Sequence, residues 1–213
     1  MSLDRSQLVV MARWPAPLRC KRRLAAGVGP VQAAAVQARL TSHVLQESLI
    51  ACRSSVRGSG RPELVLAVSG LGSRAAARWG RSLGADRTVL QGTGSLGLRL
   101  RRQVRRVLRE GAASLLLIGT DLPELTAADL RQAWCLLQRR PLVLGPARDG
   151  GYWLIGLRDD WPVLFAGQGG AIPWGSDQVL RRTLAAAGAA GLQPACLPDR
   201  SDLDHPQDLR RWR

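Results

Sequence analysis

The chain has 213 residues, of which 46% are hydrophobic and 22% charged, so its composition excludes a disordered or fibrous protein. Its 31 Lys and Arg against 16 Asp and Glu give a net charge of +15, which suits an anionic partner: nucleic acid, lipid or a phosphorylated small molecule. The sequence lacks stacking aromatic runs and any recognisable nucleic-acid module, so we expect no nucleic acid as partner.

Apolar runs and amphipathic stretches alternate along the whole chain. Strands are predicted at residues 7–12, 62–69, 87–91, 114–119, 141–147, 152–157 and 192–198. Helices are predicted at residues 29–52, 73–80, 98–110, 126–138, 176–191 and 205–212, the fourth with Thr126 as N-cap. The first apolar run is too short to span a membrane, so we expect no transmembrane segment.

The cysteines are far apart and the chain shows no secretion signal. They are Cys20, Cys52, Cys135 and Cys196. This pattern predicts reduced thiols and a cytoplasmic protein.

The most basic stretch, residues 98–110, carries an apolar stripe on one helical face and arginines on the other. The stripe consists of Leu100, Val104, Val107 and Leu108, and the arginines are Arg101, Arg102, Arg105, Arg106 and Arg109. We favour a surface helix that packs through its stripe. Peripheral contact with an anionic membrane fits the same pattern and stays open.

Strands separated by helices predict an α/β fold with a mostly parallel sheet covered on both faces. No linker, repeat or low-complexity segment interrupts residues 1–213, so we expect a single domain. Ligands of such sheets bind outside the carboxyl ends of the strands. That rule directs attention to four loops, at residues 13–24, 119–123, 148–151 and 200–204.

The first of these loops is basic and contains Lys21, the only lysine in the chain. It is not a Walker loop, because the glycines and the terminal G-K-[ST] are missing. On charge alone, a phosphate site and a solvated basic loop are equally good interpretations. A compact ammonium where every other basic residue is a planar guanidinium favours the phosphate site.

Carboxylates follow the strands at the other loops. Asp121 comes directly after the apolar strand at 114–119, and Asp202 and Asp204 alternate, so an extended backbone places them on one face. Carboxylates at this edge suit a divalent metal, whereas turn or helix-cap roles are the competing interpretation.

Two further motifs are weaker on their own. Asp149 precedes two glycines, which allow close approach to a ligand but are equally typical of a hairpin turn. Gln91 and Gly92 open a glycine-rich entry to the basic helix, whose N-terminus suits an anion.

In this order the motifs resemble the DUF2064 family, the radical-SAM/selenodomain-associated transferase 1 group, some members of which are called arsenosugar-biosynthesis glycosyltransferases. The matching residues of the first two motifs are Pro15, Pro17, Lys21, Arg23, Leu24, Gln91, Gly92, Gly94, Leu96, Gly97 and Arg99. Those of the middle motifs are Gly119, Asp121, Pro123, Gly145, Pro146, Asp149, Gly150, Gly151 and Tyr152. The last are Pro173, Trp174, Asp202, Asp204, Pro206, Asp208 and Leu209.

The chain departs from the family pattern at four positions. Arg13 stands in place of lysine, Leu18 in place of the loop glycine, Arg22 in place of threonine and His205 in place of a late threonine.

The resemblance implies a single-domain GT-A (nucleotide-diphospho-sugar transferase) fold, related to guanylyltransferases. It implies phosphate or nucleotide contacts by Arg13, Lys21, Arg23, Gln91 and Gly92. It further implies an Mg²⁺ or Mn²⁺ ion on Asp121 and Asp204, with Asp149 and Asp202 as catalytic residues facing a small-molecule acceptor.

The expected function is that of a metal-dependent glycosyltransferase using a nucleotide sugar. Alternatives are a nucleotidyltransferase that uses a nucleoside triphosphate, or a basic binding protein that has lost catalysis. The sequence leaves the base, the sugar, the acceptor and the oligomeric state open.

Overall fold

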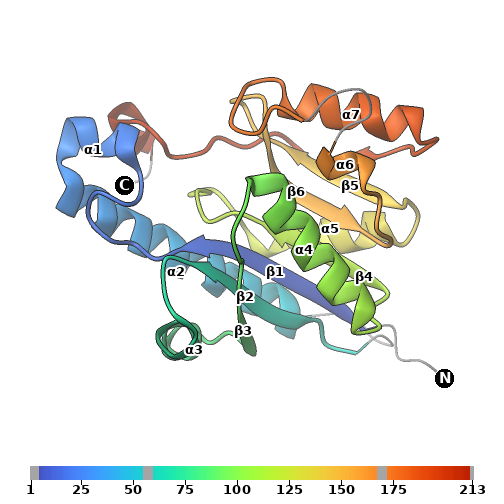
Figure 1. Ribbon diagram of the computed structural model, residues 1–213, viewed down its shortest axis with the longest axis horizontal. Helices are drawn as coiled ribbons and strands as arrows, with labels where there is room; N and C mark the ends of the chain where they lie inside the picture. Colours follow the sequence, from blue (N-terminus) through green and yellow to red (C-terminus); the bar gives the residue numbers. More distant parts are fainter. Residues whose placement is uncertain (1–4, 55–59, 167–171, 212–213) are drawn as a thin grey trace.

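A mostly parallel sheet forms the centre of the computed structural model, which describes residues 5–54, 60–166 and 172–211 (Figure 1). The strands are β1 (Ser6–Arg13), β2 (Glu63–Ser69), β3 (Arg87–Leu90), β4 (Ser114–Ile118), β5 (Leu142–Pro146), β6 (Tyr152–Leu157) and β7 (Ala195–Cys196). Their order is β3-β2-β1-β4-β6-β5-β7, and among the described strands only β6 runs antiparallel to its neighbours. The predicted α/β fold is therefore confirmed.

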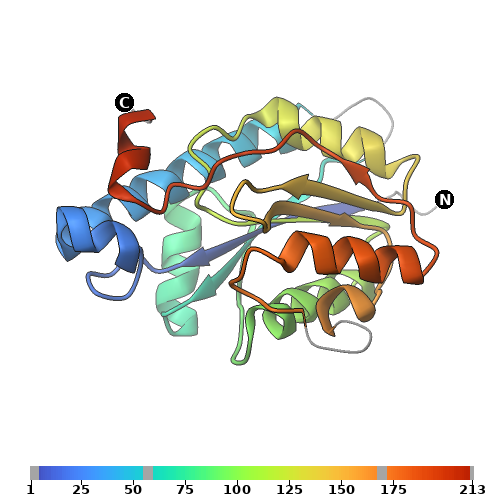
Figure 2. The same ribbon diagram turned by 90° about the horizontal axis from the view of Figure 1, so that it is seen from above.

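Helices cover both faces of this sheet (Figure 2). They are α1 (Arg22–Val28), α2 (Pro30–Arg53), α3 (Ser73–Ser82), α4 (Leu96–Arg109), α5 (Ala127–Leu137), α6 (Val163–Ala166), α7 (Val179–Ala189) and the 3-10 helix η1 (Pro206–Arg211). Helices α2, α3 and α5 pack on one face, and α4, α6 and α7 on the other. Helices α1 and η1 lie side by side beyond the carboxyl end of β1.

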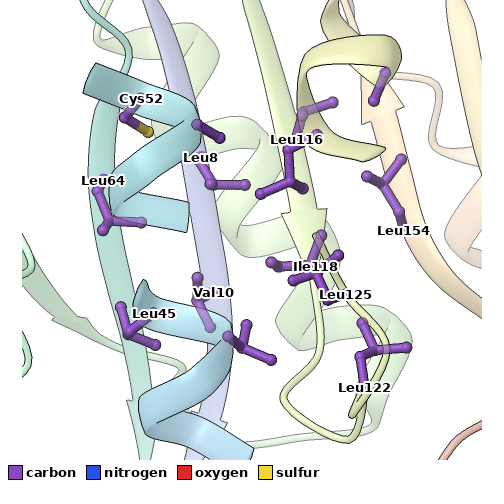
Figure 3. Close-up of a cluster of buried hydrophobic side chains, with 14 of the residues drawn as sticks. Leu8, Val10, Leu45, Cys52, Leu64, Leu116, Ile118, Leu122, Leu125 and Leu154 are labelled. Carbon is purple, nitrogen blue, oxygen red and sulfur yellow. The ribbon is translucent and has the colours of Figure 1, made fainter. Parts of the chain in front are cut away.

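Alternating side chains of the central strands build two core layers. In β1, Leu8 and Val10 face the α2 side of the sheet, whereas Val9 faces the α4 side. Figure 3 shows the first layer, in which Leu45 and Cys52 of α2 lie over the strand side chains. Burying each such leucine or valine contributes about 1.5–3 kcal/mol, so the strand ends that carry the loops are rigidly held.

The segment after β7 returns to the carboxyl edge of the sheet. Arg200 forms a bridge with Ala147, and the backbone N–H of Leu203 donates to the carbonyl of Asp121 over 2.9 Å. The Leu203 side chain is fully buried in a small cluster with Leu24 of α1. Residues 200–204 therefore lie beside the loop that follows β4.

The structure differs from the sequence-based elements at four places. The basic loop ends at Lys21, because α1 begins at Arg22, and the short helix α6 was not predicted. The last strand is only two residues long. The helix expected at 205–212 is a 3-10 helix over its described part, and Trp212 lies outside the described residues.

The basic helix packs as predicted. Leu100, Val104 and Val107 of α4 are buried against the sheet, whereas Arg105 and Arg109 are exposed. No helix in the described ranges combines the length and the apolar character that a membrane crossing requires.

Candidate active site

A cavity of about 670 Å³ opens at the carboxyl edge of the sheet. Its walls come from the loops after β1 and β4, the β5–β6 turn, the start of α4 and the returning C-terminal segment. Eight of the nine candidate residues line it: Arg13, Lys21, Arg23, Gln91, Asp121, Asp149, Asp202 and Asp204. Gly92 is not among the residues that line the cavity.

Lys21 is the centre of an ion-pair cluster. Its ammonium lies 2.8 Å from Oδ1 of Asp121 and 2.9 Å from Oδ1 of Asp204, and it also donates to the carbonyl of Leu203. The Lys21 side chain is only 2% exposed. Burial lowers the pKa of Lys21, but the two carboxylates outweigh burial, so the pKa is raised and the ammonium is charged.

The backbone at Lys21 explains how a lysine reaches this position. Lys21 precedes α1 with φ 47° and ψ 48°, a left-handed conformation that is uncommon outside glycine. Leu18, which stands where the family has glycine, also adopts a positive φ, of 64°. Its side chain is 76% exposed, so the substitution adds no buried bulk at this turn.

Hydrogen bonds from two distant segments fix the backbone position of Asp121. Thr120 is buried, and its hydroxyl accepts a hydrogen bond of 3.0 Å from Gln37 of α2. Asp121 itself accepts the backbone bond from Leu203. Gln37 also lines the cavity, and sequence analysis missed it, because one buried glutamine in a long amphipathic helix carries no local signal.

Four carboxylates line the cavity, those of Asp121, Asp149, Asp202 and Asp204. Burial above all, then the three neighbouring carboxylates, raises the pKa of Asp202 to about 7, although Lys21 acts in the opposite direction. Asp149 accepts a bond of 2.9 Å from the N–H of Gly151, as expected of a tight turn. In a chain with 16 acidic residues and a net charge of +15, this grouping concentrates negative charge at one place.

Gln91 does not present a free amide to the cavity. It is 3% exposed, and its side-chain N–H groups donate to the carbonyls of Ala12 and Ala67, each over 2.9 Å. Its carbonyl oxygen accepts a bond of 2.9 Å from Arg99. Gln91 therefore orients Arg99, which lines the cavity and belongs to the same sequence motif.

Arg99 is a residue that sequence analysis did not select. Burial, then the guanidinium groups of Arg13 and Arg102, lowers the pKa of Arg99. Arg13 and Arg99 thus bring two like charges to the cavity wall close to each other. The only available signal was the position of Arg99 in the motif.

Two motif glycines have packing roles. Gly92 has φ +74°, and a Cβ there would overlap the guanidinium of Arg102, which donates to the Gln91 and Thr93 carbonyls. A Cβ on Gly97 would overlap the indole of Trp174.

The cavity also has an aromatic wall. The ring of Trp174 meets that of Tyr152 edge to face, with centroids 6.1 Å apart. Both rings line the cavity and present apolar surface beside the carboxylates.

The chemistry of the donors fits a hard divalent cation. Asp121 and Asp204 both reach one ammonium, so their carboxylates converge, and carboxylate oxygens are the ligands that Mg²⁺ prefers. Within the described ranges, no three His, Cys, Asp or Glu side chains are placed to hold a metal ion together. Mg²⁺ is often held by one or two carboxylates plus substrate phosphates, and the two acids match that mode.

Comparison with known proteins agrees with the fold. The chain aligns over 94% of its length, and over 82% of the other chain, with a candidate nucleotide-diphospho-sugar transferase from Desulfovibrio desulfuricans G20 (27% identity, TM-score 0.79). CMP:2-keto-3-deoxy-manno-octonic acid synthetase complexed with CTP gives 14% identity and a TM-score of 0.59, covering 97% and 96% of the two chains.

A third structure is glucosyl-3-phosphoglycerate synthase from Mycobacterium tuberculosis in complex with Mn²⁺, UDP and glucosyl-3-phosphoglycerate. It is 14% identical, with a TM-score of 0.56, covering 98% of this chain and 75% of the other. No curated protein matches the chain.

These likenesses define the class: the fold is the GT-A fold of nucleotide-diphospho-sugar transferases. A family model described as "uncharacterized protein conserved in bacteria" (DUF2064) matches residues 52–176. The chain belongs to the DUF2064 family, as its motifs indicate.

Proposed function

We propose that the protein is a metal-dependent transferase of the glycosyltransferase type, which takes a nucleotide-activated sugar as donor and a small molecule as acceptor. The proposal rests on one observation: Lys21, Asp121 and Asp204 come from distant parts of the chain and meet at one cavity. Such a grouping of an ammonium and two carboxylates can bind a diphosphate together with a cation.

The basic residues of the cavity form the proposed donor site. Arg13, Lys21 and Arg23 would bind the phosphates, and Gln91 would act by orienting Arg99. Preorganised cations at this position stabilise the charge that develops on the leaving nucleoside diphosphate. The cavity is partly enclosed by buried residues, which strengthens these interactions relative to water.

Two of the acidic residues form the proposed acceptor site. Asp149 and Asp202 face the space beside the aromatic wall of Tyr152 and Trp174. One of the two carboxylates would accept the proton of the acceptor hydroxyl, and the rings would cover an apolar face of a sugar. Asp121 and Asp204 would hold the divalent cation, which when bound neutralises charge on the donor phosphates.

A thermal-shift screen tests this assignment. Nucleoside diphosphates and sugar nucleotides are added with and without Mn²⁺, and we expect stabilisation that needs the metal. At a ligand concentration of 100 times Kd, the stabilisation is about 2.7 kcal/mol. Asp121→Ala should abolish the shift. A shift of equal size in EDTA, or in Asp121→Ala, would contradict the proposal.

A nucleotidyltransferase is the second candidate, and the number of cations in the cavity favours it. Besides Lys21, the cavity is lined by Arg13, Arg19, Arg22, Arg23 and Arg99, six basic groups against four carboxylates. That excess of two positive charges, with a divalent cation added, matches a nucleoside triphosphate better than a diphosphate. The products separate the two candidates: pyrophosphate released from a triphosphate indicates nucleotidyl transfer, and nucleoside diphosphate released from a sugar nucleotide indicates glycosyl transfer.

A further inference from the structure

The two acids proposed to hold the cation already have a cationic partner in the protein itself. The ammonium of Lys21 lies within 2.9 Å of both carboxylates and contacts the same atom type, Oδ1, on each. The lysine side chain is 2% exposed, whereas the side chains of Asp121 and Asp204 are 44% and 39% exposed. Lys21 therefore reaches the acids from the protein side, and the acids are open toward the cavity.

We propose that Lys21 and the divalent cation compete for the Asp121–Asp204 pair. The ammonium holds the pair in the ligand-free protein, and the cation replaces it when a diphosphate binds. This inference rests on the proposed function, because it assumes that the cation binds at these two acids.

Geometry makes the two cations alternatives. The ammonium contacts the oxygens at 2.8 and 2.9 Å, whereas Mg²⁺ requires oxygens at about 2.0–2.1 Å. Both cations draw on the same two carboxylates, and like charges a few ångströms apart repel strongly in a partly buried site. A metal ion bound between these carboxylates therefore displaces the ammonium.

The number of groups available to each cation determines which one binds the two acids in the ligand-free protein. Without substrate, a metal ion at this site has two carboxylates and, in the described part of the chain, no third acidic, His or Cys group to complete a set. The ammonium, by contrast, donates to Asp204 and to the Leu203 carbonyl and forms an ion pair with Asp121. The lysine is therefore the better partner in the ligand-free state.

A diphosphate reverses this balance. Its oxygens supply the missing metal ligands and, at the same time, offer new acceptors to a rotatable ammonium. Metal and diphosphate should then bind together, and each should raise the affinity of the other by the same factor. The positive φ of Lys21 is consistent with this, because a turn held in an uncommon conformation by ion pairs can change when they break.

Manganese binding to the ligand-free protein tests the competition. Free Mn²⁺ is measured by electron paramagnetic resonance for the parent protein, for Lys21→Met and for Arg22→Met. Arg22→Met is the matched control, since it removes the same charge one position away, from a cavity-lining residue that forms no ion pair with either acid in the described structure.

We expect Lys21→Met to bind Mn²⁺ at least tenfold more tightly than the parent, and Arg22→Met to change the affinity by less than threefold. Adding Asp121→Asn to Lys21→Met should remove the gain. An affinity of Lys21→Met equal to or below that of the parent overturns the proposal.

The parent protein offers a test without substitution, because Lys21 is its only lysine. Selective ¹³C labelling of lysine gives one set of side-chain NMR signals, which reports this ammonium directly. We expect Mg²⁺ alone or pyrophosphate alone to move the Cε signal little, and both together to move it clearly. A full shift with Mg²⁺ alone, or none with both, overturns the proposal.

The failure of the competition and the failure of the proposed function give different results. If sugar nucleotides with Mn²⁺ stabilise the parent while Lys21→Met gains no Mn²⁺ affinity, the competition is wrong and the function stands. If Lys21→Met gains affinity but no nucleotide stabilises the parent, the competition stands and the proposed function is wrong.

Discussion

Replacing Lys21 by arginine tests whether the site requires the compact shape of an ammonium or only its charge. Lys21→Arg keeps the charge of the side chain. The compact ammonium, which donates in three directions, is replaced by a longer and planar guanidinium group. The ammonium donates to Asp204 and the Leu203 carbonyl and forms an ion pair with Asp121, and the side chain has 2% exposure, so a larger group must displace one of these partners.

The expected loss of stability follows from two contributions. Charge-assisted hydrogen bonds contribute about 1.5–3 kcal/mol each when well formed, but the two acids are about 40% exposed, so we take about 1 kcal/mol for each disrupted bond. Inserting a larger group into a filled space costs about 1–3 kcal/mol. With one of the two bonds disrupted, we therefore expect Lys21→Arg to lower the free energy of unfolding by about 2–4 kcal/mol.

Urea unfolding followed by tryptophan fluorescence measures this loss, since the chain contains seven tryptophans. Arg22→Lys, the reverse exchange at an exposed neighbouring position, is the control and should stay within about 0.5 kcal/mol of the parent. If Lys21→Arg unfolds at the same urea concentration and with the same slope as the parent, charge alone is sufficient and the argument from shape is wrong.

Two further predictions concern the surroundings of the site, and a third concerns the ion pairs of Glu110 at the opposite edge of the sheet. Hydrogen bonding, chiefly from Arg87, holds the pKa of Glu110 at about 2; with its 34% exposure discounted, Glu110→Gln should cost about 1–2 kcal/mol at pH 7. Because the folded-state pKa is depressed, that difference should vanish as the pH falls from about 4.5 to about 2, and a constant difference in pH-dependent urea unfolding would refute it. Gly97→Ala places a methyl group against an indole ring and should lower the free energy of unfolding by about 1–3 kcal/mol; an unchanged urea midpoint would contradict this. Gln91→Leu should release Arg99 and weaken nucleotide binding at least tenfold, as measured by calorimetry. An affinity equal to that of the parent would mean that Arg99 does not contact the nucleotide.

Much of the fold and of the site could be predicted from sequence, because local residue patterns determine the secondary structure and the positions of several site residues. Strands and helices follow from hydrophobic periodicity, and Asp121 could be placed at the sheet edge because a strand without charges precedes it. Asp204 could be placed there because its loop follows the last predicted strand and it alternates with Asp202. The alternation of elements then brings these loops to one edge.

What could not be predicted depends on contacts between distant residues. No local pattern says that Lys21 pairs with two acids, one of them 183 positions away, or that its φ is positive. Gln91 has the residue type of a ligand contact, but its partners are the backbone of two strands and Arg99. Glycine has two common uses, close ligand approach and close packing, and only the position of Arg102 assigns Gly92 to the second.

The bond between Lys21 and Asp204 has a consequence for folding. It closes a loop of 183 positions across the whole sheet, so it can form only after the intervening strands and helices have been assembled. Ligand binding at this bond is therefore available only to fully folded molecules. A nucleotide that binds there should slow hydrogen exchange throughout the sheet, as far as β7, and not merely in the loops it touches.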